Sequence, residues 1–114
     1  LEPFEPYRLI GLALAHHALG ETIAADAVLK ELIEKYAQDW SYNIAYIHAY
    51  RNDIEGAFHW LDEAIRYADP GLSLIVAEPL FSNLHHDARW AAALRDLGKS
   101  PEQLEAIRFS YAPP

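Results

Sequence analysis

Two stretches of the chain, residues 12–33 (LALAHHALGETIAADAVLKELI) and residues 44–65 (IAYIHAYRNDIEGAFHWLDEAI), repeat each other 32 positions apart. Alanine, histidine and aliphatic residues recur in one register: Leu12-Ala13-x-x-His16 with Ala25-x-x-x-Leu29 becomes Ile44-Ala45-x-x-His48 with Ala57-x-x-x-Leu61. The connector inside each stretch repeats as well, since Gly20-Glu21 is matched by Asn52-Asp53. Self-similarity at a period of about 20 to 50 residues is typical of solenoids, in which each unit hides its apolar face against its neighbours. The repeat therefore predicts a tandem array of helical hairpins, an architecture that usually binds other molecules.

Length and composition indicate one folded domain over residues 1–114. Hydrophobic residues make up 52% of the chain and charged residues 23%, a balance that excludes general disorder. A chain of this length buries roughly two thirds of its unfolded surface, which is enough for a core. Its apolar stretches are interrupted well short of the roughly 20 residues that a membrane helix needs, so we expect no membrane association.

The charged and sulfur-containing residues limit the function further. The formal net charge is −8 with nine Lys and Arg residues, which opposes binding to the phosphate backbone of nucleic acids. Cysteine is absent, which excludes disulfides and thiol chemistry. The chain begins at Leu1 and contains no methionine, so we expect a trimmed piece of a longer translation product.

Four helices are predicted in the first 70 residues. The first ends at Leu19, because Gly20 suits the left-handed position after a helix, and the second runs from about Thr22 to Tyr36 with an i, i+3, i+4 apolar stripe. Asp39 is predicted to cap the third, Trp40 to about Arg51. Asn52-Asp53 turns the chain and caps the fourth, Ile54 to Ala68, which Asp69-Pro70-Gly71 ends. Short loops between such helices predict antiparallel packing.

The repeat is lost after Gly71, where we expect a short helix and an irregular loop. Asp87 then caps a helix that ends at Gly98. Ser100-Pro101-Glu102-Gln103 is a capping box with proline at the first helical position, and it starts a final helix.

The spacing L-G-x-x-Y followed by A-x-x-x-F belongs to the tetratricopeptide repeat, and both units resemble it. A tryptophan precedes this spacing in the full motif, and Leu9 and Ser41 stand at its position. The other replacements are Ala13 and Ala45 for glycine, His16 and His48 for tyrosine, and Leu29 and Leu61 for phenylalanine. The period is shorter than the usual 34 residues, and the late proline is displaced to Pro70. The resemblance covers roughly residues 6–70 and implies an all-α, right-handed α-α superhelix.

We accordingly expect two tetratricopeptide-like hairpins, residues 6–36 and 38–70, a helical C-terminal cap at 71–109 and a loose tail at 110–114. Segments of the cap, among them Pro79-Leu80-Phe81, resemble the ending of tetratricopeptide arrays in large bacterial regulators. Those proteins often carry a nucleotide cyclase, a kinase or a winged-helix DNA-binding domain upstream. The resemblance implies a cytoplasmic C-terminal fragment of a multidomain signalling protein.

The candidate binding site is a groove on the first helix of each hairpin, because these helices line the concave face of tetratricopeptide arrays. Three tyrosines spaced by four residues share one side of the third helix, and tyrosine joins a large contact area to a hydrogen-bonding tip. The candidate groove residues are Tyr7, Ile10, Leu14, His17, Tyr42, Asn43, Tyr46 and Tyr50. The alternative is that these rings pack against a neighbouring repeat or the C-terminal helices. The carboxylate clamp of the family, built from Lys, Arg and Asn, does not fit the apolar Ile10 and Leu14.

Catalytic and metal-binding patterns are weak. Adjacent histidines such as His16-His17 point about 100° apart on a helix, and no H-x-x-x-H pair occurs in the chain. The recurrence of His16 and His48 favours a packing role. Nucleophile elbow, Walker and dinucleotide-binding motifs are absent from the chain. We therefore expect no cofactor, no metal and no enzymatic activity.

The sequence favours a non-catalytic protein-interaction module that binds a protein or peptide partner. A structural alternative is self-association into a homo-oligomer, or docking onto an upstream domain of the same parent. A remote alternative is a metal-dependent enzyme that uses His85, His86 and Asp87.

Overall fold

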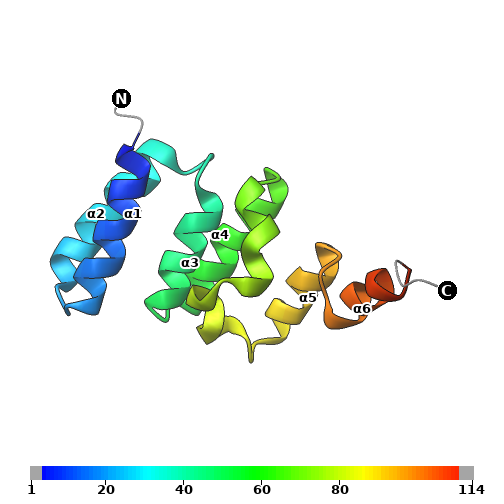
Figure 1. Ribbon diagram of the computed structural model, residues 1–114. Coiled ribbons are helices and arrows are strands. Elements are labelled where there is room, and N and C mark those ends of the chain that lie inside the picture. The colour runs from blue at the N-terminus through cyan, green and yellow to red at the C-terminus, as the bar shows by residue number, and fades with distance from the viewer. Residues whose placement is uncertain (1–3, 111–114) are drawn as a thin grey trace. The chain divides into compact units, whose positions relative to one another are not determined.

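The computed structural model describes residues 4–110, and this part of the chain is all-α (Figure 1). The elements are α1 (Glu5–Ala18), α2 (Thr22–Tyr36), α3 (Ser41–Tyr50), α4 (Ile54–Arg66), the 3-10 helices η1 (Pro70–Ala77) and η2 (Pro79–Leu84), α5 (Ala88–Asp96) and α6 (Pro101–Ser110). None of the described helices combines the length and the apolar character that crossing a membrane requires. The predicted tail lies outside the described residues, apart from Ser110 at the end of α6.

The chain divides into two compact units between Asn83 and Leu84. The predicted cap, residues 71–109, is therefore split, and its first part belongs with the hairpins. The rings of Phe81 and Tyr42 lie 5.5 Å apart, and the Asn83 amide Nδ2 donates to the carbonyl of Ala49 over 2.8 Å. These contacts tie η1 and η2 to α3.

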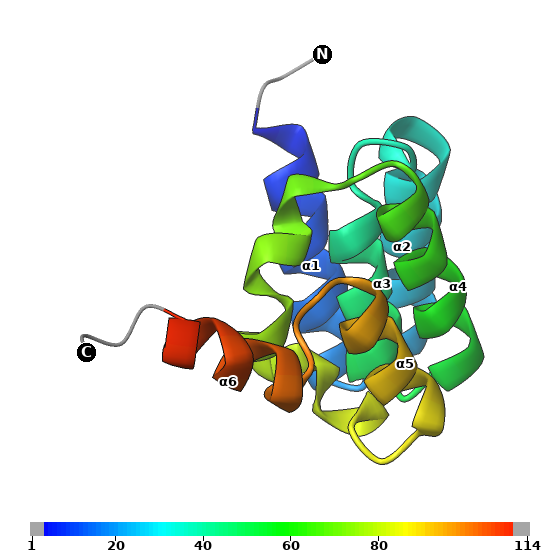
Figure 2. The same ribbon diagram turned by 90° about the vertical axis from the view of Figure 1, so that its right-hand side faces the viewer.

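The first unit contains two helical hairpins. Helices α1 and α2 pack side by side, as do α3 and α4, and α1 also packs on α3 (Figures 1 and 2). The four repeat alanines have no exposed surface: Ala13, Ala25, Ala45 and Ala57. A methyl group at each crossing point lets the helix backbones approach closely, so the repeated motif is the packing interface itself.

The loop inside each hairpin has the same geometry. Gly20 and Asn52 both adopt a left-handed conformation, with φ of +75° and +60°. The next amide, from Glu21 or Asp53, donates 2.9 Å back to the carbonyl of His16 or His48, as in a Schellman motif.

The repeated histidines support this loop with their side chains. His16 Nδ1 lies 3.4 Å from Glu21 Oε1, and His48 Nδ1 lies 2.8 Å from Asp53 Oδ2. A Cβ on Gly56 would overlap both His48 Nδ1 and Asp53 Oδ2, so this glycine leaves room for the second pair. The two histidines thus help to close the hairpins.

Helix α4 is shorter than predicted. It ends at Arg66 rather than Ala68, because Ala68 adopts a left-handed φ of +53°. The amide of Asp69 then donates 2.9 Å to the carbonyl of Ala64, which gives this helix the same kind of ending as α1 and α3. The pattern could not show this, since alanine rarely leaves the right-handed region.

The predicted cap of α3 by Asp39 is wrong. The helix begins at Ser41, and a distant residue supplies the cap: Asp69 Oδ2 accepts the amide of Tyr42 over 3.0 Å. Its other oxygen, Oδ1, accepts the amide of Gly71 over 2.8 Å. One carboxylate therefore joins the start of α3 to the turn after α4.

The ring of Tyr42 packs directly on that turn. A Cβ added to Gly71 would lie 2.4 Å from Tyr42 Cδ2, so only glycine allows the observed approach. Tyr42 is 3% exposed, and its ring also meets Phe81 and Tyr46 edge to face.

The caps predicted for the second unit are confirmed. Asp87 accepts the amide of Arg89 over 2.9 Å at the start of α5. In the capping box before α6, the Ser100 amide donates to Gln103 Oε1 over 2.9 Å, and the Gln103 amide donates to Ser100 Oγ over 3.2 Å. Gly98 has a φ of +73°, as expected for the residue that follows a helix.

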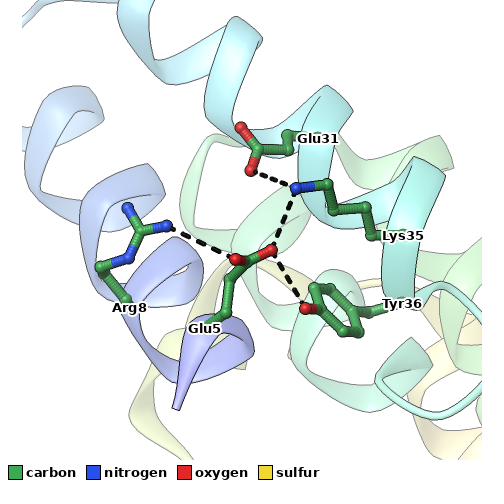
Figure 3. A network of polar contacts seen from close by, with 5 residues as sticks. All are labelled: Glu5, Arg8, Glu31, Lys35 and Tyr36. Atoms are coloured by element: carbon green, nitrogen blue, oxygen red, sulfur yellow. Dashed lines mark hydrogen bonds and ion pairs between the residues drawn. The ribbon is translucent and has the colours of Figure 1, made fainter. Parts of the chain in front are cut away.

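A polar network links the start of α1 to the end of α2 (Figure 3). Glu5 Oε1 accepts hydrogen bonds from Lys35 Nζ at 3.1 Å and from the Tyr36 hydroxyl at 3.0 Å, while Arg8 lies 3.9 Å from Glu5 Oε2. Lys35 also donates to Glu31 over 3.2 Å. The hydrogen bonds from Lys35 and Tyr36 hold the pKa of Glu5 below its ordinary value of 4.5.

The substitution Gly71→Ala is expected to lower the free energy of unfolding by about 1–3 kcal/mol, because the new methyl group overlaps the Tyr42 ring. The matched control is Gly11→Ala, on the exposed surface of α1, where a Cβ meets no atom within 4 Å. It is expected to raise the free energy of unfolding by about 0.5–1 kcal/mol through helix propensity. Urea unfolding followed by circular dichroism measures both. Equal midpoints for the two variants would contradict this packing of Tyr42.

The substitution Glu5→Gln is expected to destabilise the fold at pH 7. A lowered folded-state pKa contributes stability that is complete above the ordinary value of 4.5 and is lost as the pH falls through the lowered value. The unfolding midpoints of the variant and the parent should therefore converge below pH 4.5. Asp62→Asn, which removes an exposed acid of α4, controls for net charge. A constant difference between Glu5→Gln and parent across this range would show that the network is not electrostatic.

Candidate functional site

The eight predicted groove residues come from two helices that pack against each other, α1 and α3. The structure separates them into three groups: a buried group, a cluster near the start of the helices, and a pair near their ends. The groups are, in this order, Ile10, Leu14 and Tyr42; Tyr7, Asn43 and Tyr46; His17 and Tyr50.

The buried group does not form an open floor. Tyr42 is 3% exposed and Ile10 is 6% exposed, while Leu14 is half-buried against the same core. The alternative was packing of the rings against a neighbouring repeat or the C-terminal helices, and Tyr42 packs against Gly71 and Phe81 of the segment that follows the second hairpin. The expectation that Ile10 and Tyr42 floor the groove therefore has to be corrected: these side chains support it from beneath.

The second group forms a connected polar and aromatic surface. Asn43 Nδ2 donates to the Tyr46 hydroxyl over 2.9 Å, and the ring of Tyr46 meets that of Tyr42 at 5.6 Å. Burial raises the pKa of Tyr46, and the hydrogen bond from Asn43 offsets this only in part. Tyr7 is 62% exposed, so it offers most of its ring to a partner.

The third group lies at the opposite end of the two helices. The rings of His17 and Tyr50 meet edge to face, with centroids 5.3 Å apart. This contact bridges the last turns of α1 and α3.

A hollow of about 400 Å³ opens beside the second group. Its walls come from α1, from the start of α3 and from the turn into η1. It is lined by Tyr7, Asp39, Trp40, Tyr42, Asn43, Asp69, Pro70, Gly71 and Leu74. This hollow contains the most exposed part of the predicted groove, and we take it as the candidate functional site.

Six of its residues were not among the sequence candidates: Asp39, Trp40, Asp69, Pro70, Gly71 and Leu74. Trp40 meets Tyr7 edge to face at 4.8 Å, with ring planes 85° apart. The sequence pattern indicates only a helix cap for Asp39 and a turn for Asp69, and it places Leu74 in the short helix or loop after Gly71. No local signal marks them as neighbours, because α4 separates Trp40 from Asp69 along the chain.

The lining of the hollow includes an exposed apolar side chain. Leu74 of η1 is 62% exposed, so it offers apolar contact area beside the aromatic residues.

A larger hollow, of about 510 Å³, lies between α2 and the end of α3. Its charged groups pair with one another: Asp26 with Arg51, His48 with Asp53, and Lys30 with Glu34 at 3.9 Å. The charges are therefore already used in the fold. The Asp53 carboxylate belongs to the hairpin loop. Burial raises its pKa, but the Gly56 amide and His48 outweigh this and lower it overall.

The residues of the remote metal hypothesis have other contacts. The ring of His85 lies 5.0 Å from that of Trp90, and Asp87 caps α5. Hydrogen bonds from Arg89 lower the pKa of Asp87 to about 2. Within residues 4–110, no group of three or more potential ligand side chains is placed to hold a metal ion.

Comparisons of the chain with protein-family models, with curated proteins and with solved structures gave no match.

Two conservative substitutions separate a supporting tyrosine from a surface one. The Tyr42 hydroxyl is buried and has no hydrogen-bond partner among the described protein atoms, so Tyr42→Phe is expected to leave the free energy of unfolding unchanged or to raise it by up to about 1 kcal/mol. Tyr46→Phe loses the bond from Asn43 and should cost about 0.5–1.5 kcal/mol. Urea unfolding measures both. A loss above about 1 kcal/mol for Tyr42→Phe would mean that the hydroxyl has a partner, such as an ordered water.

Proposed function

We propose that residues 6–70 form a pair of tetratricopeptide-like repeats whose α1–α3 face binds a peptide or a partner protein without catalysing a reaction. The observation that carries this proposal is the hollow beside Tyr7, Asn43 and Tyr46. It combines exposed aromatic surface with hydrogen-bonding groups, as protein-recognition surfaces do.

Three features support the tetratricopeptide assignment. The positions that match the small residues of the motif, Ala13, Ala25, Ala45 and Ala57, are fully buried. Both hairpins have the same loop geometry. The first helices of the two hairpins pack on each other, which is the arrangement that lines the concave face in the family. Continued stacking of such hairpins would give a right-handed superhelix.

The polar groups of the hollow favour binding over catalysis. Asp69 accepts the amides of Tyr42 and Gly71, so its carboxylate is committed to the fold. Asn43 donates to Tyr46. The described lining residues contain no serine, threonine, cysteine, lysine or histidine, and among their carboxylates that of Asp69 is already bound to two backbone amides.

A second candidate function is docking onto another copy or onto a domain of the parent chain. The observation that favours it is on α6, where Leu104, Ile107 and Phe109 are exposed. Leu104 and Ile107 are three positions apart and share a helix face. This surface belongs to the second unit, whereas the hollow belongs to the first.

The test begins with peptides selected from a random display library on the purified chain. Changes in the NMR chemical shifts of the backbone amides on peptide addition are expected to map the binding site to α1, α3 and η1. Tyr7→Ala should weaken their binding about tenfold, because an aromatic contact surface is lost.

The matched control is Tyr67→Ala, which removes an exposed tyrosine from the end of α4, outside the hollow. Peptides that map elsewhere, or that bind Tyr7→Ala as tightly as the parent, would contradict the proposed site. If no peptide is selected and light scattering shows a dimer that Ile107→Asp dissociates, the docking function on α6 is the better interpretation.

A further inference from the structure

We propose that the hollow accepts a basic side chain, so that the segment bound on this face presents a lysine or an arginine to Tyr7, Trp40 and Asp39. The inference rests on the proposed function and specifies the chemistry of the partner.

One wall of the hollow is aromatic. Tyr7 and Trp40 stand at 85° to each other with centroids 4.8 Å apart, and Tyr7 is mostly exposed. A lysine or arginine that enters between them and the α3 start comes within the distance of about 6 Å at which cations are attracted to ring faces. The aliphatic stem of the same side chain can pack on Leu74, which is exposed at the rim.

The charged side chains that line the hollow are acidic. Asp39 is exposed and Asp69 half-buried, and the described residues that line the hollow include no basic side chain. Glu78 adds negative charge near Tyr42 and Tyr46. Burial is the largest cause of the raised pKa of both tyrosines, and the charge of Glu78 also raises it. The chain as a whole carries a formal charge of −8, so approach of a basic segment is favoured at longer range.

An acidic occupant is disfavoured at the same place. The start of a helix normally attracts anions through its free amides. At α3 this position is already filled, because Asp69 accepts the amide of Tyr42. An incoming carboxylate would therefore meet two aspartates and no cation among the described lining residues. A partner that presents its C-terminal carboxylate does not fit.

The size of the hollow agrees with one side chain in an extended segment. A volume of about 400 Å³ is near the lower end of ligand sites, which span roughly 300–1,000 Å³.

The experiment is a selection of random dodecapeptides on the full chain, followed by a double-mutant cycle. Sequencing of the selected pool is expected to show lysine or arginine enriched at one position. Replacing that residue by glutamine in a synthetic peptide should weaken binding to the parent about tenfold.

Asp39→Asn should weaken the basic peptide about threefold to fivefold and leave the glutamine peptide unchanged, because the lost attraction needs both charges. Asp39 is exposed and does not cap α3, so this variant is expected to fold, which circular dichroism checks. Asp62→Asn makes the same charge change on α4 and should leave both affinities unchanged.

The outcomes separate the two proposals. Peptides that depend on Tyr7 but show no basic enrichment, or no coupling to Asp39, would overturn the inference and leave the proposed function standing. If Asp39→Asn and Asp62→Asn weaken binding of the basic peptide equally, the effect comes from net charge alone, and this outcome also overturns the inference. Peptides that do not map to α1, α3 and η1 would overturn both.

Discussion

The carboxylate of Asp69 is the contact on which the arrangement of the first unit depends. It accepts the amides of Tyr42 and Gly71, and so joins the start of α3 to the turn that follows α4. Because the turn is held there, Gly71 lies against the ring of Tyr42, and η1 continues over α3. The hollow exists because the same turn forms one of its walls beside Trp40 and Asn43. A capping interaction thus shapes both the core and the candidate binding surface.

The two hairpins share the same helix packing and the same loop geometry. Buried alanines set the distance between helices, and a left-handed residue followed by an acid closes each loop onto a histidine. The variation lies outside this shared frame. Trp40, Tyr42 and Tyr46 belong to the second hairpin, and the aromatic character of the site follows from these departures. The repeated residues form the helical framework, and the residues that differ between the two hairpins give the site its chemical character.

The predicted groove was partly recognisable from sequence. Helical spacing indicated that Tyr42, Tyr46 and Tyr50 share a side of α3, and Tyr7 and Asn43 do line the hollow, with Asn43 hydrogen-bonded to Tyr46. Spacing gave no measure of depth, however, and Tyr42 and Ile10 proved to be buried. Trp40 was read as a helix start and Asp69 as a turn residue. Their roles depend on which segments become neighbours, and this is a property of the folded chain.

The sequence alone determined what is local: the helices of the repeat, the glycines that end helices at Gly20 and Gly98, the turn at Asn52-Asp53, the caps at Asp53, Asp87 and Ser100, and the buried register of the repeat. These features follow from hydrogen bonds and side-chain periods that span only a few residues. The tertiary structure decided that Asp69 rather than Asp39 caps α3, that the segment after Gly71 divides between two units, and that an acidic, aromatic hollow forms beside Tyr7. Each of these depends on contacts between residues far apart in the chain, because the loss of conformational entropy in bringing such residues together is compensated only when the whole unit packs.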